Sequence, residues 1–164
     1  MFAAVAATPS PEQLAAGIAP LLGEWQGEGQ GQWVRATPFC YRETLSLRPV
    51  PGRALVRWSQ ATVDAETGEL SHSEEGYLRL LPEARLELVL AIPAGYVEIH
   101  TGTWDGTGLE LGLRALAASP SSRALSMVHR QLRLEGELLR HTVRIAVDSA
   151  TPVPHVEALL RRLA

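Results

Sequence analysis

The chain has 164 residues, a length that fits one globular domain, and 46% of its residues are apolar against 20% that are charged. The formal charge of -3, with Lys and Arg spread along the sequence, argues against nucleic acid as a partner. A single cysteine, Cys40, excludes an intramolecular disulfide and a multi-cysteine metal site.

The sequence carries no signal for a membrane or for secretion. No apolar run approaches the roughly 20 residues that span a bilayer, and the apolar start at residues 1–7 lacks the basic flank of a secretory signal. We therefore expect a cytoplasmic protein that forms one domain over residues 1–164, with residues 1–9 as a flexible N-terminal tail.

A short helix is predicted near the start of the chain. Ser10 is a good N-cap, Pro11 suits the first helical position, and Gln13 completes the spacing of a capping box. An apolar stripe follows at helical spacing, formed by Leu14, Ile18, Leu21 and Leu22. The helix is expected to end at Gly23.

From Gly23 to about residue 150 the apolar period changes from 3.6 to 2. Leucine alternates with other residues in the runs 86–90 and 109–113, so one face of each strand is apolar. Turn dipeptides recur between the runs at Pro51-Gly52, Thr67-Gly68, Leu81-Pro82, Ala94-Gly95, Asp105-Gly106, Ser119-Pro120 and Glu135-Gly136. A spacing of roughly a dozen residues is typical of hairpins and predicts sequentially connected antiparallel strands.

These strands predict an all-β fold, an antiparallel up-and-down β-barrel of about ten strands with a short N-terminal helix. Closure removes the two exposed edges of a meander and leaves an interior able to hold a small ligand. A β-sandwich is the alternative. Near the C-terminus the pattern changes again and predicts a short amphipathic helix packed on the barrel, with its apolar stripe at Val156, Leu159, Leu160 and Leu163.

Few residues in the sequence point to a particular chemistry. A phosphate loop, His-Glu-x-x-His, a serine elbow and Cys-x-x-Cys are all absent. The five histidines are dispersed without a chelating pair: His72, His100, His129, His141 and His155. This argues against a zinc hydrolase. A single histidine can still bind haem iron, because the porphyrin supplies four nitrogens.

Four colinear parts of the sequence resemble the nitrobindins, haem proteins with a barrel like that of lipocalins and fatty-acid-binding proteins. The first is the glycine-spaced tryptophan run at residues 21–31, together with Pro-Phe-Cys-Tyr-Arg-Glu, which begins at Pro38. The other three are the His-x-Glu-x-Gly-Tyr-x-Arg strand at residues 72–79, the hairpin at residues 86–98 and the closing run at residues 155–162. The resemblance covers about residues 14–163. It implies one haem b per chain at one mouth of the barrel.

The resemblance also implies roles for particular residues. His155 would be the axial ligand of the iron, and His72 would face the haem pocket from the other wall. The glycine-tryptophan motif marks the barrel, with glycines that let neighbouring strands approach closely and a tryptophan that plugs one end. Its residues here are Gly23, Trp25, Gly27 and Gly29.

The chain departs from the nitrobindin pattern at several positions. Arg35 stands where the family has a haem-contacting threonine, and it can pair with a propionate or crowd the pocket. Arg123 stands where relatives carry a lysine near the haem edge. Ile92 occupies a cavity position that is often His or Gln in relatives, and Ile145 occupies one that is often Met. We therefore expect a more apolar distal wall.

The remaining candidates are assigned to packing. Four aromatic residues are expected in the core: Trp25, Trp33, Trp58 and Tyr41. His129 and His141 are expected on outward strand faces, and Cys40 is expected to pack within a strand. Without the resemblance, His155 would be interpreted as a surface histidine.

The function implied by the resemblance is isomerisation of peroxynitrite to nitrate at a five-coordinate haem iron that can also bind nitric oxide. Two alternatives stay open. One is a non-enzymatic carrier of a fatty acid or another small apolar ligand, with the carboxylate on an enclosed arginine such as Arg35. The other is a nitric oxide sensor or transporter. The protein is expected to be a monomer or a homodimer.

Overall fold

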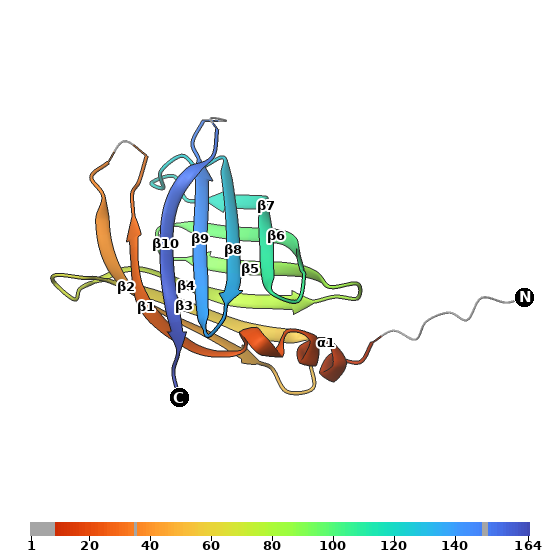
Figure 1. Cartoon of the computed structure of the whole chain (residues 1–164). Helices are drawn as coiled ribbons and strands as arrows, with labels where there is room; N and C mark the ends of the chain where they lie inside the picture. Colours follow the sequence, from red (N-terminus) through yellow and green to blue (C-terminus); the bar gives the residue numbers. More distant parts are fainter. Residues whose placement is uncertain (1–8, 35, 149–150) are drawn as a thin grey trace, which may run out of the picture.

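Ten antiparallel strands form a closed barrel in the computed structural model, which describes residues 9–34, 36–148 and 151–164 (Figure 1). The strands are β1 Gly23–Gly31, β2 Phe39–Pro49, β3 Leu55–Asp64, β4 Leu70–Leu80, β5 Arg85–Ile92, β6 Tyr96–Trp104, β7 Gly108–Ala118, β8 Met127–Glu135, β9 Leu138–Ala146 and β10 Val153–Arg162. Each strand pairs with its neighbour in sequence, and β1 pairs with β10. The predicted up-and-down barrel is confirmed, and the sandwich alternative is wrong.

The N-terminal helix is shorter than expected. Ser10 Oγ accepts a hydrogen bond from the Gln13 amide at 3.2 Å, and Gln13 Oε1 accepts one from the Ser10 amide at 2.8 Å, so the capping box is present. The helix α1, Pro11–Gly17, then gives way to a 3-10 turn, η1, Ala19–Leu21. The cause is Pro20, which lacks an amide hydrogen and disfavours helical backbone at the residue before it. Within the described residues, no helix is long and apolar enough to cross a membrane.

The predicted C-terminal helix is wrong, because this segment is the strand β10. Ala158 and Leu160 are buried while Leu159 is 38% exposed, which is the alternation of a strand. β10 forms hydrogen-bonded ladders with both β9 and β1. Closing the barrel therefore pairs the backbone groups on both sides of the segment. If the segment were instead a helix on the outside, β1 and β9 would be two open sheet edges.

The glycine motif allows close contact between β1 and its neighbours. A Cβ atom on Gly27 would lie 2.0 Å from the backbone oxygen of Leu159 on β10. A Cβ atom on Gly29 would lie 2.3 Å from the ring of Tyr41 on β2. Both positions require glycine because any larger residue would overlap the neighbouring strand or ring.

Trp25 closes the barrel end that carries α1. Its side chain is 1% exposed, and its indole nitrogen donates to the Leu21 carbonyl oxygen at 2.9 Å. The Arg162 guanidinium lies over the ring, 4.3 Å from the ring centroid. The indole is thus held by the 3-10 turn on one side and by the last residue of β10 on the other, as the expected plug of the barrel.

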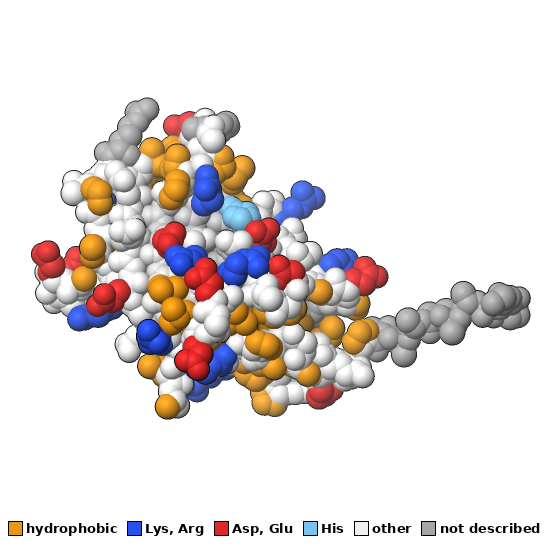
Figure 2. All heavy atoms as spheres, in the orientation of Figure 1, with side chains coloured by type: hydrophobic (Ala, Val, Ile, Leu, Met, Phe, Trp, Pro, Cys, Tyr) orange, Lys and Arg blue, Asp and Glu red, His pale blue; other side chains and the backbone are white. Residues whose placement is uncertain are grey.

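The two ends of the barrel interior differ in packing. At the α1 end, large side chains form one buried cluster that includes Leu21, Trp25, Leu45, Leu47, Trp58, Leu88 and Leu109. A second, smaller cluster of Val128, Val143 and Ile145 lies against Trp33, Val34 and Val156. Outside, acidic and basic side chains are interspersed on the face covered by β8, β9 and β10 (Figure 2). The large buried side chains thus fill the end of the barrel near α1, and the opposite end is less densely packed.

Candidate functional site

A cavity of about 630 Å³ occupies the barrel end opposite α1. Its wall is built from the first residues of β2, β4, β6, β8 and β10, residues in the second halves of β3, β5 and β9, and the connections after β1, β5 and β7. This volume falls within the range of about 300–1,000 Å³ that is typical of small-molecule sites. The barrel therefore holds a ligand-sized space, as the strand count predicted.

His155 lies on the cavity wall near the start of β10. Its Nδ1 atom is 2.9 Å from the backbone oxygen of Gln32. A carbonyl oxygen only accepts, so Nδ1 carries the hydrogen and the Nε2 lone pair stays available in the neutral ring. Among the described residues, no hydrogen-bond partner is found for Nε2. The indole ring of Trp33 meets the imidazole edge-on at 5.1 Å.

The surroundings of His155 favour the neutral imidazole. Burial lowers the pKa of His155, and this effect outweighs the opposing hydrogen bond to Gln32. An imidazole that is neutral, held in one tautomer and fixed by a backbone carbonyl has the properties of a metal ligand. The change from the expected helix to a strand is what aims this ring at the cavity.

The structure places the other candidates of the sequence analysis as follows. Ile92 and Ile145 are buried and line the cavity, and His72 lines it from β4. Arg123 lies at the mouth, with its guanidinium 5.1 Å from the centroid of the Trp33 ring. Arg35 lies outside the described residues.

Two of the packing assignments are wrong. Trp33 is only half-buried and belongs to the cavity wall rather than to the main core, because it lies beyond the end of β1 and packs against the smaller cluster. Cys40 is exposed at the cavity rim, because it alternates with the buried Tyr41 near the start of β2. Trp25 and Trp58 are buried in the core as expected, and Tyr41 is buried and also contacts the cavity.

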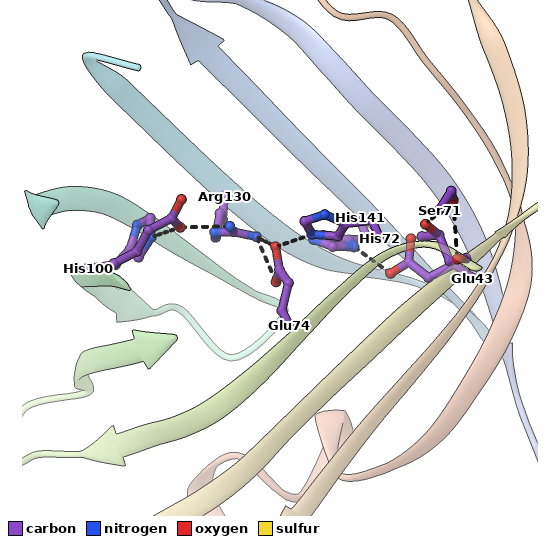
Figure 3. Close-up of polar contacts among 9 residues, drawn as sticks. Glu43, Ser71, His72, Glu74, His100, Arg130 and His141 are labelled. Atoms are coloured by element: carbon purple, nitrogen blue, oxygen red, sulfur yellow. Dashed lines mark hydrogen bonds and ion pairs between the residues drawn. The ribbon is translucent and has the colours of Figure 1, made fainter. Parts of the chain in front are cut away.

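Charged side chains meet inside the barrel, where the sequence analysis expected apolar walls (Figure 3). Arg130 on β8 lies between Glu74 on β4 and Glu98 on β6, with nitrogen–oxygen distances of 2.7 Å and 2.8 Å. All three side chains line the cavity, and each is at most 4% exposed. These three residues are called the interior cluster below.

Two histidines extend the interior cluster at its ends. His72 Nε2 lies 3.1 Å from Glu74, and His100 Nε2 lies 2.8 Å from Glu98. Figure 3 shows the resulting line of contacts running across the barrel through Arg130. The His72 side chain is 38% exposed, whereas the His100 side chain is fully buried, so the line runs from the rim into the wall.

The charges of the interior cluster are set by their mutual contacts. Burial alone would raise the pKa of Glu74, but the Arg130 guanidinium and the His72 hydrogen bond hold that pKa well below its usual range. Burial likewise opposes ionisation of Glu98, and the contacts with His100 and Arg130 lower its pKa. The two carboxylates raise the pKa of Arg130 in spite of its burial.

A second buried pair joins β2 and β9. His141 Nδ1 lies 2.6 Å from Glu43 Oε1, and both side chains are at most 2% exposed. The expectation that His141 faces outward is wrong, because its strand parity points it inward beside Trp58. Within the described part of the chain, four buried atoms have no hydrogen-bond partner in this region: Tyr41 Oη, Glu43 Oε2, Gln60 Oε1 and His141 Nε2.

The polar interior corrects the expected apolar wall. The isoleucines form only part of the lining, next to carboxylates, a guanidinium and imidazoles. The sequence does contain a signal for this. Arg130 alternates with Val128 and Leu132, both buried, so period 2 places the arginine on the inward face of β8. The same parity points Glu74 inward with Leu78 on β4, but it fails on β6, where the apolar Val97 and Ile99 are exposed and Glu98 is buried.

Comparisons with known proteins agree on one family. The model of the "THAP4-like, heme-binding beta-barrel domain" family matches residues 15–162. A protein named peroxynitrite isomerase 1 from Rhodococcus jostii (strain RHA1) is 34% identical over 155 residues, covering 94% of this chain and 88% of the relative. Peroxynitrite isomerase 2 from Mycobacterium avium (strain 104) is 33% identical over 151 residues, covering 90% and 93%.

A solved structure supports the same relationship. The crystal structure of Rv2717c from M. tuberculosis superposes with a TM-score of 0.83 at 30% sequence identity, covering 92% of this chain and 98% of that one. Sequence and barrel topology thus lead to the same group of proteins. The chain belongs to the family of THAP4-like heme-binding β-barrel domains.

Proposed function

We propose that this protein binds haem b with His155 as the axial iron ligand and isomerises peroxynitrite to nitrate. One observation carries the proposal. The Gln32 carbonyl oxygen accepts a hydrogen bond from Nδ1 of His155 and leaves Nε2 available at the wall of a ligand-sized cavity. The names of the relatives, peroxynitrite isomerases at 33–34% identity, supply the reaction.

The residues around the cavity fit a porphyrin. Val128, Val143, Ile92 and Ile145 offer apolar surface to the macrocycle. Arg123 provides a cation at the mouth, where a propionate can pair with it. The site thus combines one nitrogen ligand, apolar walls and a peripheral positive charge.

Each residue has a physical task in this proposal. When bound, haem would supply a Lewis-acidic iron for chemistry on nitrogen oxides. His155 holds the iron, and the Gln32 carbonyl keeps the imidazole in one tautomer and orientation. The Trp33 ring packs against the imidazole and helps to hold it in place.

The interior cluster argues against the alternative of a fatty-acid carrier. A carrier with this topology would anchor a ligand carboxylate on a buried arginine. Among the described residues that line the cavity, Arg130 is the buried arginine, and two glutamates already contact its two terminal nitrogens. A third carboxylate would therefore meet two like charges beside this guanidinium.

Titration with haemin tests the axial ligand. Addition of haemin to the wild-type protein should give a sharp Soret shift that saturates at one haem per chain, and His155→Ala should abolish it. His129→Ala is the matched control, because His129 is also a half-buried strand histidine but lies outside the cavity lining. Unchanged haem absorption in the His155→Ala variant would refute the assignment.

Stopped-flow kinetics test the reaction. The haem-loaded protein should accelerate peroxynitrite decay and raise the nitrate yield above that of free haemin at equal concentration. The His155→Ala variant with added haemin should behave as free haemin. If the loaded wild-type protein binds nitric oxide but gives no nitrate beyond the free-haemin level, the protein is a nitric oxide sensor or transporter and the enzymatic proposal is wrong.

A further inference from the structure

The interior cluster does more than the packing of the barrel requires. Removing two carboxylates and a guanidinium from water costs several kcal/mol per ion, and well-packed apolar residues at such sites are often equally stable or more stable. The same barrel fills its other end with leucine and tryptophan. Stability therefore gives no reason for three buried charges, and their position on the cavity wall suggests an effect on the bound group.

The interior cluster has a net negative charge. Its contacts keep both glutamates ionised at neutral pH, and Arg130 carries the one positive charge, so the three residues sum to -1. Exposure of at most 4% leaves little water to screen this charge. Because the three residues and His155 line the same cavity, the field of the cluster acts on whatever His155 holds.

We propose that Glu74, Arg130 and Glu98 lower the reduction potential of the haem and so keep its iron ferric. This inference rests on the proposed binding of haem through His155. A nearby negative charge stabilises Fe³⁺ relative to Fe²⁺, because one-electron reduction removes a unit of positive charge from the site. The charge of the interior cluster thus selects the oxidation state of the haem iron.

The expected size follows from Coulomb's law. For one unit charge at roughly 10 Å, the width of such a cavity, and an effective dielectric constant of about 20, the ferrous-to-ferric ratio changes on the order of tenfold. For a one-electron couple, a tenfold change corresponds to about 60 mV. Ferric iron is the Lewis acid towards peroxynitrite, whereas ferrous iron binds nitric oxide. The cluster would therefore favour isomerisation over nitric oxide carriage.

A spectroelectrochemical titration of the haem-loaded protein tests this inference. The midpoint potential is measured with redox mediators for the wild type, Glu74→Gln and Glu98→Gln. Each substitution removes one buried negative charge and should raise the potential by about 60 mV, which is the tenfold change above. The shift should persist at high salt, because the site is buried.

Glu75→Gln is the matched control. Glu75 is the next residue on β4, carries the same charge and faces the outside. Its removal should leave the potential unchanged, because solvent screens an exposed charge. A general loosening of the barrel would instead change the Soret band and the unfolding midpoint without this pattern of potentials.

The outcomes separate this inference from the proposed function. If Glu74→Gln and Glu98→Gln bind haem with the wild-type Soret band and the wild-type potential, the inference is wrong and His155 ligation stands. A failure of the wild-type protein to bind haem would overturn both. Either single variant carries the test, so a folding defect in one of them does not remove it.

Discussion

The barrel contains two ion clusters of identical composition in opposite surroundings. The interior cluster places one arginine between two glutamates inside the cavity wall. The exterior cluster, defined as Arg140 with Glu135 and Glu157, places the same three residue types on the outer face, with side-chain exposures of 34%, 40% and 51%. The contact distances are similar, and the main difference is the exposure of the side chains to water.

This difference shows that contact geometry alone does not determine how much an ion pair contributes to stability. Outside, water screens the charges and holding the long side chains in place costs entropy, so the pairs contribute little. Inside, desolvation is expensive and attraction is strong, so the cluster is costly to break and of little net benefit to stability. Its field, however, reaches the cavity. The exterior cluster stays a surface feature, and the interior cluster belongs to the site.

The largest expected effect is the loss of the central interior arginine. Arg130→Ala leaves two buried carboxylates without a counter-charge and should lower the free energy of unfolding by about 3–5 kcal/mol. Urea denaturation followed by tryptophan fluorescence measures this. A loss below about 1 kcal/mol, the value of a surface pair, would show that water enters the cluster.

Replacement of the whole interior cluster sharpens the comparison. The combined variant Arg130→Met, Glu74→Leu and Glu98→Leu should keep the free energy of unfolding or raise it by about 1–4 kcal/mol, because no charge is left buried. The same denaturation experiment applies. A large loss of stability in this variant, equal to that of Arg130→Ala, would mean that the cluster stabilises the barrel after all.

Acid should weaken the protein through the interior glutamates. Their folded pKa values lie below the ordinary value of about 4.3, so their contribution to stability is fully present above that pH and is lost as the pH falls towards the folded pKa. Unfolding midpoints measured from about pH 5 down to pH 2 should fall less steeply in Glu74→Gln/Glu98→Gln than in the wild type. Identical slopes in the two proteins would contradict the low folded pKa values.

The smallest expected effect belongs to the exterior cluster. Arg140→Ala should lower the free energy of unfolding by about 0.2–1 kcal/mol at low salt. This loss should shrink further in 1 M salt, where the Debye length is about 3 Å. Denaturation of the variant and the wild type at both salt concentrations measures this loss. A loss above about 2 kcal/mol that does not depend on salt would show that the exterior pairs behave like buried ones.

Part of the site followed from the family resemblance and from the strand pattern, and part of it did not. Ile92, Ile145 and Arg123, which the resemblance singled out, line the cavity that the strand count predicted. The interior cluster was missed because the sequence analysis assigned no role to Arg130 and treated the two glutamates only as parts of motif runs. Arg130 lies 56 residues from Glu74 and 32 from Glu98, and no local pattern joins residues at such separations.

The sequence by itself determined the features that depend on neighbours along the chain. Period-2 alternation, the turn dipeptides and the Ser10 capping box specify strands, hairpins and a helix start through local backbone preferences. The tertiary structure decided the C-terminal segment, whose leucines fit a helix as well as a strand. Only barrel closure supplies β10 with two partner strands, and only then does His155 meet Gln32, 123 residues away. The physical reason is that closure pairs two open sheet edges at once. This stabilisation depends on strands far apart in the sequence, so no short stretch of sequence predicts it.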